Sequence, residues 1–172
     1  MLGCLGVFFA IDEQTVNLLR LTPRSERAEY VSEELEEDYY AERREQAEQI
    51  DKAWDAVHRA FSDGELLFDA TGSYPGNAII LGGECLYGNE DGEEDYIITL
   101  KTPGMVRDIS GLLNNLTEEA FRPLYFAIDQ AKYGFPTDEI DFKYTWDNLI
   151  GSRDFWLRAA GNGQYVIFTV DQ

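Results

Sequence analysis

Two apolar, strand-like segments lie at opposite ends of this sequence, and this placement most restricts its fold. Cys4–Ile11 is short, rich in aromatic and aliphatic residues, and ends in charge at Asp12. Tyr165–Val170 has the same character. The helical and strand-like runs between them have unequal lengths, without the regular alternation of a doubly wound fold. We therefore expect an α+β fold, in which helices pack on a mixed sheet of short strands that includes both terminal segments.

The intervening segments are predicted from apolar spacing and turn chemistry. Ile50–Phe61 has the clearest helical pattern, with apolar residues at i, i+3, i+4 and i+7. Short strands are expected at Ala78–Leu81 and Tyr96–Leu100. Because the chain has 172 residues, of which 44% are hydrophobic, we expect residues 1–172 to form a single domain. Further helices are expected after Asp12, across 25–49, after Thr102, after Thr117 and across 142–160.

The chain is strongly acidic, with 33 acidic and 14 basic residues and a formal net charge of -19. Nucleic acid is disfavoured as a partner, because its phosphates are bound by neutralising Lys and Arg side chains. An anionic membrane surface is disfavoured for the same reason. A basic protein partner remains open, and so does an acidic surface that serves only solubility.

The N-terminal segment does not have the pattern of a secretion signal. It lacks a basic start, and Asp12-Glu13 ends its apolar run. No apolar run reaches the ~18 residues of a membrane span. We therefore expect a cytoplasmic protein in which Cys4 and Cys85 are reduced thiols.

Familiar catalytic and cofactor motifs are absent from the sequence. It has no P-loop, no complete dinucleotide fingerprint and no nucleophile elbow. One histidine and two isolated cysteines cannot form a His-rich or Cys-based metal site. The acidic loop 89–95 fails the calcium-loop pattern, because Tyr87 and Ile98 would occupy the first and last ligand positions. We expect no cofactor and no metal.

One constellation of residues could support catalysis. On the helix predicted over Ile50–Phe61, helical geometry places Asp51, Asp55 and His58 on one stripe. Asp55 could orient the imidazole, and Glu84, which follows two glycines, is the candidate that would complete the site. Alternatively, His58 is a structural residue at the boundary of the core, and Asp51 and Asp55 face water.

The segment Ser25–Gln49 is the most charged part of the chain. We expect a helix with a solvated acidic face, interrupted by exposed tyrosines. Such a surface could equally be only solubilising. The candidate partner-binding residues are Tyr30, Glu33, Glu37, Tyr39 and Tyr40.

A family resemblance rests on five sequence strings: Gly6–Asp12, Ile50–His58, Ile79–Glu84, Arg153–Trp156 and Val166–Thr169. They resemble the YfbM-like family of small bacterial proteins of unknown function. The resemblance implies an α+β fold, and it implies no activity, cofactor or catalytic residue. The acidic segment 26–48 and the loop 89–95 look like additions specific to this chain.

Two functional hypotheses follow. The first is a non-catalytic acidic binding protein, similar to an inhibitor or immunity protein, that recognises a basic protein partner. The second is a small cytosolic enzyme with a site around His58, Asp55, Asp51 and Glu84. A cleft that encloses these four residues would favour the enzyme.

Overall fold

The computed structural model describes residues 4–66, 71–88 and 95–171. Within these residues, five strands form one sheet in the order β2-β1-β5-β4-β3, and every neighbouring pair is antiparallel. The α+β class and the inclusion of both terminal segments are confirmed, and the described sheet is antiparallel rather than mixed. The strands are β1 (Gly6–Ile11), β2 (Ala47–Asp51), β3 (Glu84–Tyr87), β4 (Tyr96–Lys101) and β5 (Tyr165–Asp171).

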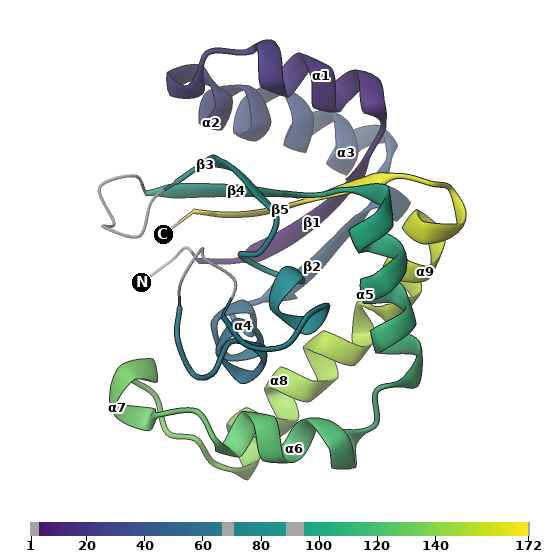
Figure 1. Cartoon of the computed structure of the whole chain (residues 1–172). Coiled ribbons are helices and arrows are strands. Elements are labelled where there is room, and N and C mark those ends of the chain that lie inside the picture. The colour runs from purple at the N-terminus through teal and green to yellow at the C-terminus, as the bar shows by residue number, and fades with distance from the viewer. Residues whose placement is uncertain (1–3, 67–70, 89–94, 172) are drawn as a thin grey trace.

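Helices cover both faces of the sheet (Figure 1). No helix in the described ranges is both long and apolar enough to cross a membrane. The upper layer in the view contains α1 (Glu13–Leu21), α2 (Arg27–Glu29), a π-helical turn (Tyr30–Leu35) and α3 (Glu36–Glu42). The other layer contains α4 (Trp54–Phe61), α5 (Pro103–Asn115), α6 (Glu118–Phe126), α7 (Gln130–Tyr133), α8 (Glu139–Gly151) and α9 (Arg153–Gly161).

The sheet separates two apolar cores, and alternating side chains of β1 contribute to both. Phe8 and Ala10 face the core beneath α4–α9, while Phe9 and Ile11 face the core beneath α1–α3. Because both faces are covered, all six residues of β1 are buried, and the strand has an unbroken apolar sequence.

Side-chain caps begin three of the predicted helices. Asp12 Oδ1 accepts a hydrogen bond from the Thr15 backbone N–H at 2.8 Å. Thr102 and Thr117 cap α5 and α6 in the same way. The helix starts expected at these three residues are confirmed.

The helix predicted over Ile50–Phe61 is shorter than expected. It begins at Trp54, whereas Ile50 and Asp51 end strand β2. Ile50 is a strand residue, but it packs in the same core as α4. Its apolar side chain therefore fits the helical spacing of the α4 residues although it is not part of the helix. Asp51 has φ of 53°, at the sharp change of direction between strand and helix.

The strand predicted at Ala78–Leu81 is wrong. These residues are buried, but they form a 3₁₀ turn (η4, Gly76–Ala78) and the turn after it, and the strand begins at Glu84. Gly82 permits this close approach, since a Cβ atom there would lie 2.5 Å from the carbonyl oxygen of Asn77.

Two long predicted helices are interrupted. The single helix predicted over 142–160 is two helices, α8 and α9, which are separated at Ser152. The backbone N–H and the side chain of Ser152 both donate to the carbonyl of Leu149. The segment 25–49, predicted as one helix, contains the π-helical turn and ends in strand β2. Of the acidic loop 89–95, only Asp95 lies inside the described residues.

Candidate functional site

The four predicted catalytic residues do not converge. Asp55 and His58 lie in α4, and Asp51 lies at the end of β2 rather than on their helical stripe. Glu84 lies in β3, at the far edge of the sheet from β2, and forms an ion pair of 2.6 Å with Arg20 of α1. Because α1 and α4 cover opposite faces, Glu84 is turned away from the other three residues.

Asp55 contacts Arg59 instead of orienting His58. Its Oδ1 accepts a hydrogen bond from Arg59 Nε at 2.5 Å, and Arg59 also donates to the carbonyl of Gly64. Burial raises the pKa of Asp55, while the guanidinium of Arg59 opposes that shift. In the described part of the chain no hydrogen bond joins Asp55 to His58, so the predicted pair is wrong. The charged partner at i+4 forms the stronger bond.

His58 is fully buried. Its Nε2 atom lies 3.3 Å from the hydroxyl oxygen of Ser62, one turn further along the chain. This placement agrees with a structural role for the imidazole, whereas Asp55 is largely buried against Arg59 instead of facing water as that structural alternative expected.

A second polar cluster lies next to Asp55 and was not predicted. Asp141 of α8 accepts hydrogen bonds from the hydroxyl groups of Tyr125 and Tyr133. Burial and this carboxylate both raise the pKa values of the two tyrosines, and Asp141 also raises the pKa of Asp55. These partly buried hydrogen bonds connect α6, α7 and α8. Among the described residues, no three His, Cys, Asp or Glu side chains are close enough together to hold a metal ion.

The predicted partner-binding residues divide into exposed and buried groups. Glu33, Glu37 and Tyr40 are exposed, and Tyr30 is half-buried. Tyr39 is buried, and its hydroxyl donates to the carbonyl of Ala10 at 2.5 Å.

The exposed position expected for Tyr39 is therefore wrong. Tyr39 follows Val31 and Leu35 at intervals of four, and all three belong to the core beneath this layer. Burial raises the pKa of Tyr39 to about 12.

The exposed carboxylates of 29–42 form a surface that we call the acidic ridge. No Lys or Arg occurs in this stretch of sequence. Among the described residues, no basic side chain lies within ion-pair distance of the ridge; the half-buried Asp38 beside it pairs with Arg43 at 3.3 Å. The ridge consists of Glu29, Glu33, Glu34, Glu37 and Glu42.

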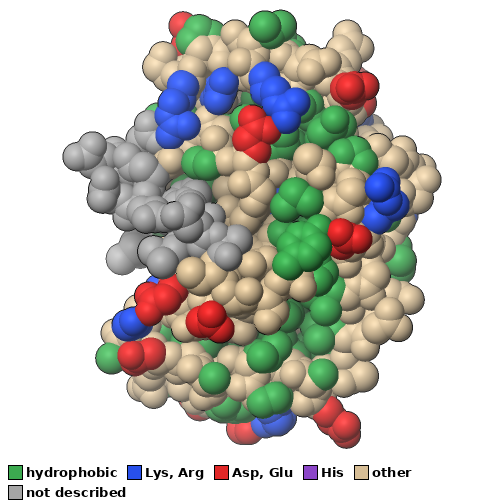
Figure 2. Space-filling model, in the orientation of Figure 1, with side chains coloured by type: hydrophobic (Ala, Val, Ile, Leu, Met, Phe, Trp, Pro, Cys, Tyr) green, Lys and Arg blue, Asp and Glu red, His purple; other side chains and the backbone are tan. Residues whose placement is uncertain are grey.

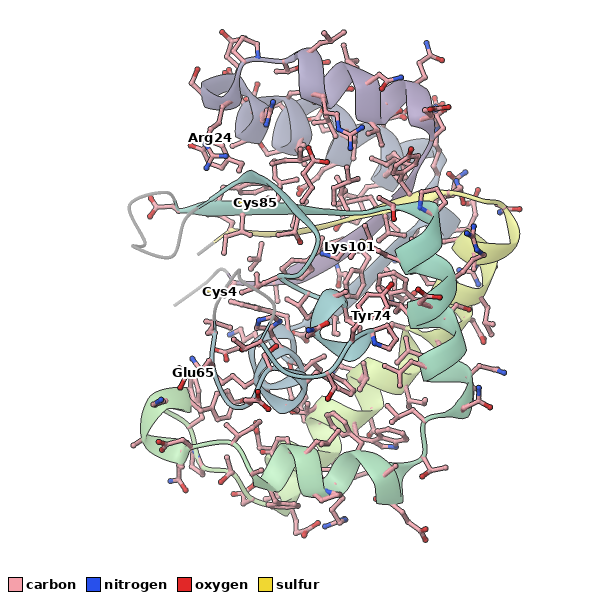
Figure 3. All side chains as sticks on the ribbon, viewed as in Figure 1. Cys4, Arg24, Glu65, Tyr74, Cys85 and Lys101 are labelled. Atoms are coloured by element: carbon pink, nitrogen blue, oxygen red, sulfur yellow. The ribbon has the colours of Figure 1, made fainter. Side chains whose placement is uncertain are left out.

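Arginines of the same layer bind the sheet edge instead of the ridge. Arg27 donates to the carbonyl of Leu86 at 3.0 Å, Arg24 donates to the carbonyl of Gly88 at 3.0 Å, and Arg20 binds Glu84. Figure 2 shows basic side chains gathered on the upper part of this face, and Figure 3 shows Arg24 beside β3. These contacts hold three arginines at the sheet edge, away from ion-pair distance of the ridge carboxylates.

A hollow of about 240 Å³ lies between α3 and the sheet. It is lined in part by Tyr40, Glu36 and Tyr96, and the Tyr96 hydroxyl donates to Glu36 Oε1 at 2.7 Å. Burial raises the pKa of Glu36, against the lowering effect of hydrogen bonds from Tyr96 and Thr169. That the carboxylate of Glu36 is half-buried was not predicted from the sequence.

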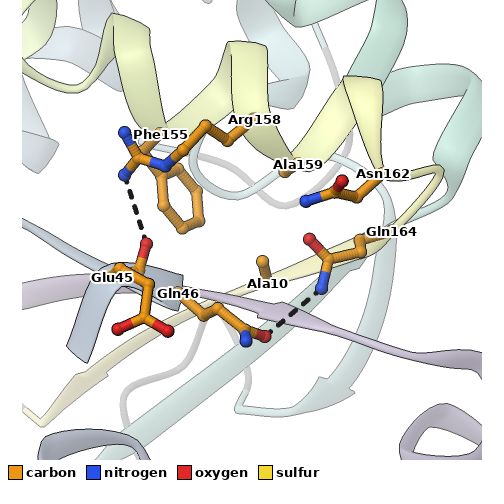
Figure 4. Close-up of a pocket in the computed structure, with 8 residues that line it drawn as sticks. All are labelled: Ala10, Glu45, Gln46, Phe155, Arg158, Ala159, Asn162 and Gln164. Carbon is orange, nitrogen blue, oxygen red and sulfur yellow. Dashed lines mark hydrogen bonds between the residues drawn. The ribbon is translucent and has the colours of Figure 1, made fainter. Parts of the chain in front are cut away.

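A hollow of about 220 Å³, which we call the amide hollow, lies between α9 and the 3₁₀ turn η3 (Arg44–Gln46) (Figure 4). Its apolar wall consists of Ala10, Phe155 and Ala159. The buried ring of Phe155 packs against Phe8, so this wall is fixed by the core.

Carboxamides and one guanidinium form the polar wall of the amide hollow. Gln164 Nε2 donates to Gln46 Oε1 at 3.3 Å, and Asn162 lies beside Gln164 (Figure 4). Arg158 Nη2 donates to the carbonyl of Glu45 at 3.1 Å. These bonds connect η3 to α9 and to the start of β5.

A larger hollow of about 370 Å³ adjoins the amide hollow. The two share Glu45 and Arg158, and the larger one is also lined by Tyr40, Arg44 and Glu48. Burial raises the pKa of Glu48, whereas the charge of Arg158 lowers it. This arrangement was not predicted, because its residues come from segments that lie far apart in the sequence.

The fold and these surfaces first define a class: α+β proteins with an antiparallel sheet enclosed by two helical layers. Residues 2–169 match the family described as "Domain of unknown function (DUF1877)", and the chain belongs to this family. The structure is similar to that of YfbM from Escherichia coli, a protein of unknown function, with 17% sequence identity and a TM-score of 0.62. The similarity covers 96% of this chain and 99% of YfbM. The YfbM-like resemblance is therefore confirmed, and the structural likeness shows a shared fold. No curated protein matches the sequence.

Proposed function

We propose that this protein is a non-catalytic binding protein that recognises a basic protein partner through the acidic ridge. Two features carry the proposal. The exposed ridge carboxylates form no ion pair among the described residues, and an exposed aromatic residue, Tyr40, lies beside them. Such a surface attracts a basic partner at long range, and the attraction weakens as salt increases.

Tyr40 supplies the apolar contact that charge alone lacks. It lies three residues after Glu37 on α3, so the two side chains lie on the same side of the helix. Its side chain is 43% exposed, and its ring packs edge-on against buried Phe9 with centroids 6.2 Å apart. A tyrosine that is already held in place loses little conformational freedom on binding, and tyrosines are frequent energetic centres of interfaces.

The charge also argues against nucleic acid and anionic membranes as partners, since both would be repelled. We place the interaction in the cytoplasm, a reducing compartment in which two isolated cysteines such as Cys4 and Cys85 stay reduced. An inhibitor or immunity protein acts in this manner, by covering a basic surface of its target.

The enzyme alternative has less support from the geometry. Asp55 is paired with Arg59, Glu84 with Arg20, and His58 is fully buried. None of the four candidate catalytic residues lines the amide hollow, the hollow that adjoins it or the hollow between α3 and the sheet.

Affinity purification from a native lysate tests the proposal, with the wild-type chain as bait at low and at high salt. The variant Glu33→Gln/Glu37→Gln removes two ridge charges. Its matched control, Glu118→Gln/Glu119→Gln, removes two exposed charges from α6, on the other helical layer. We expect a basic protein that is retained by the wild type and the control at low salt, and lost with the ridge variant and at high salt. Equal retention by all three baits, or the absence of a basic protein, would reject the ridge as the binding surface.

A further inference from the structure

The charged residues around the amide hollow and its neighbour balance one another. Arg44 and Arg158 contribute two positive charges, and Glu45 and Glu48 contribute two negative charges. The whole chain carries a formal net charge of -19, so this local balance differs from the rest of the protein. A ligand that carries both charges matches this local balance, and a net anion would in addition be repelled by the overall field.

Arg158 is held in place while part of its guanidinium remains available. Its Nη2 atom donates to the Glu45 carbonyl, a neutral main-chain acceptor. Within the described residues, no carboxylate lies within ion-pair distance of Arg158. A guanidinium fixed in this way is suited to bind a planar carboxylate through paired hydrogen bonds.

The size of the hollow limits the ligand. Sites for drug-sized molecules occupy roughly 300–1,000 Å³. The amide hollow, at about 220 Å³, falls below that range. Its apolar wall of Ala10, Phe155 and Ala159 can accept a short hydrocarbon group, while Asn162 and Gln164 offer hydrogen-bonding groups beside it.

We infer that the amide hollow and its neighbour together bind a free α-amino acid. The ligand carboxylate contacts Arg158, and its ammonium group lies in the adjoining hollow towards Glu48. The side chain of the ligand occupies the amide hollow, against Phe155. The five ridge carboxylates line neither hollow, whereas Tyr40, which we assign to the partner interface, also lines the adjoining hollow.

Binding can be measured by calorimetry and by thermal stabilisation of the full chain, with probes that differ only in charge. L-alanine and L-glutamine carry both charges. Propionate retains the carboxylate of L-alanine without the ammonium group, and L-alaninamide retains the ammonium group without the carboxylate. We expect millimolar or tighter binding of at least one of the two amino acids, and at least about tenfold weaker binding of propionate and L-alaninamide.

Variants connect the binding to this site. Arg158→Gln removes the guanidinium, and Asn162→Asp places a negative charge in the amide hollow, where the ligand side chain lies. Arg153→Gln is the control, because Arg153 is exposed on the same helix and lines neither hollow. We expect the first two variants to weaken amino-acid binding about tenfold or more, and the control to bind like the wild type.

Three outcomes would overturn the inference. The first is no binding of either amino acid at millimolar concentration. The second is binding of propionate or L-alaninamide as tight as that of L-alanine. The third is unchanged amino-acid binding by folded Arg158→Gln and Asn162→Asp proteins, since Asn162 is exposed and its replacement should not disturb the core. The ridge variant should bind amino acids normally, which separates a failure here from a failure of the proposed protein partner.

Discussion

The Nζ atom of Lys101 lies 2.5 Å from the carbonyl oxygen of Ile80, in the interior of the protein. The hydroxyl of Thr99 accepts a second hydrogen bond from this nitrogen and donates its own proton to the same carbonyl. No part of Lys101 is exposed, and burial lowers its pKa well below the ordinary 10.5. Burial therefore disfavours the charged form of this side chain in the folded protein relative to the unfolded chain.

The first prediction concerns Lys101→Met. At a pH above the ordinary lysine pKa, the side chain is neutral in both the folded and the unfolded state. As the pH falls below that value, only the unfolded state takes up the proton, so the free energy of unfolding decreases. We expect the stability of the wild type relative to Lys101→Met to increase from neutral pH towards pH ~10, by at most about 1.4 kcal/mol per pH unit. Urea unfolding across this range measures it, and parallel pH profiles would contradict the prediction.

The second prediction concerns Glu36, whose raised pKa reflects burial. A carboxyl group of this kind contributes stability in its protonated form, and that contribution is lost as the pH rises through the folded-state pKa. Gln is uncharged and can still accept the Tyr96 hydroxyl. We therefore expect Glu36→Gln to be at least as stable as the wild type at neutral pH, with the difference between them decreasing below about pH 5.

Glu36→Ala serves as the contrasting variant. It removes the acceptor of the Tyr96 hydroxyl, and we expect it to lower the free energy of unfolding by about 1–3 kcal/mol. If Glu36→Gln destabilised the protein as much as Glu36→Ala at neutral pH, the ionised carboxylate would be the stabilising form, contrary to the prediction.

The third prediction compares two glycines. A Cβ atom at Gly82 would lie 2.5 Å from the Asn77 carbonyl oxygen, whereas one at Gly111 meets nothing within 4 Å. We expect Gly82→Ala to destabilise the protein by about 1–3 kcal/mol through overpacking. Gly111→Ala lies inside helix α5 and should stabilise it by about 0.5–1 kcal/mol. Urea midpoints of the two variants should shift in opposite directions, and a shift in the same direction would count against this account of the turn.

The fourth prediction concerns Trp54, which is 5% exposed. Its ring lies 6.0 Å from that of Phe168, and its Nε1 donates to the carbonyl of Cys4 at 2.9 Å. We expect Trp54→Ala to lower the free energy of unfolding by about 3–5 kcal/mol. Trp54→Phe keeps an aromatic ring and loses the hydrogen bond, so its effect should be smaller. An unchanged urea midpoint for Trp54→Ala would refute the assignment of Trp54 as a core anchor.

Apolar patterning predicted the elements in which consecutive residues have similar burial. β1 and β5 are buried on both faces, and their continuous apolar sequences show this directly. Patterning failed at Ile50, because a strand residue and the following helix contact the same core. It also failed at Ala78–Leu81, where a buried apolar run turns back on itself instead of extending.

The candidate sites were harder to predict, because distant segments build them. Gln46 and Gln164 meet across 118 positions of sequence, and no local pattern connects them. The pairing of Asp55 with Arg59 could be predicted, because residues separated by four positions on a helix lie side by side. That spacing predicts that the guanidinium of Arg59 competes with His58 for the carboxylate of Asp55.

The pairing of β1 with β5 has a consequence for the order of folding. These two strands come from opposite ends of the described chain, yet they lie side by side in the middle of the sheet. During synthesis, the β1–β2 pair and the β3–β4 pair can each form early, but they remain two separate ribbons until β5 leaves the ribosome and joins them. Contacts of such long range slow folding, because the intervening chain must be ordered before they form. A nascent chain therefore exposes the unpaired edges of β1 and β4 from the synthesis of β4 until β5 emerges and pairs with both strands.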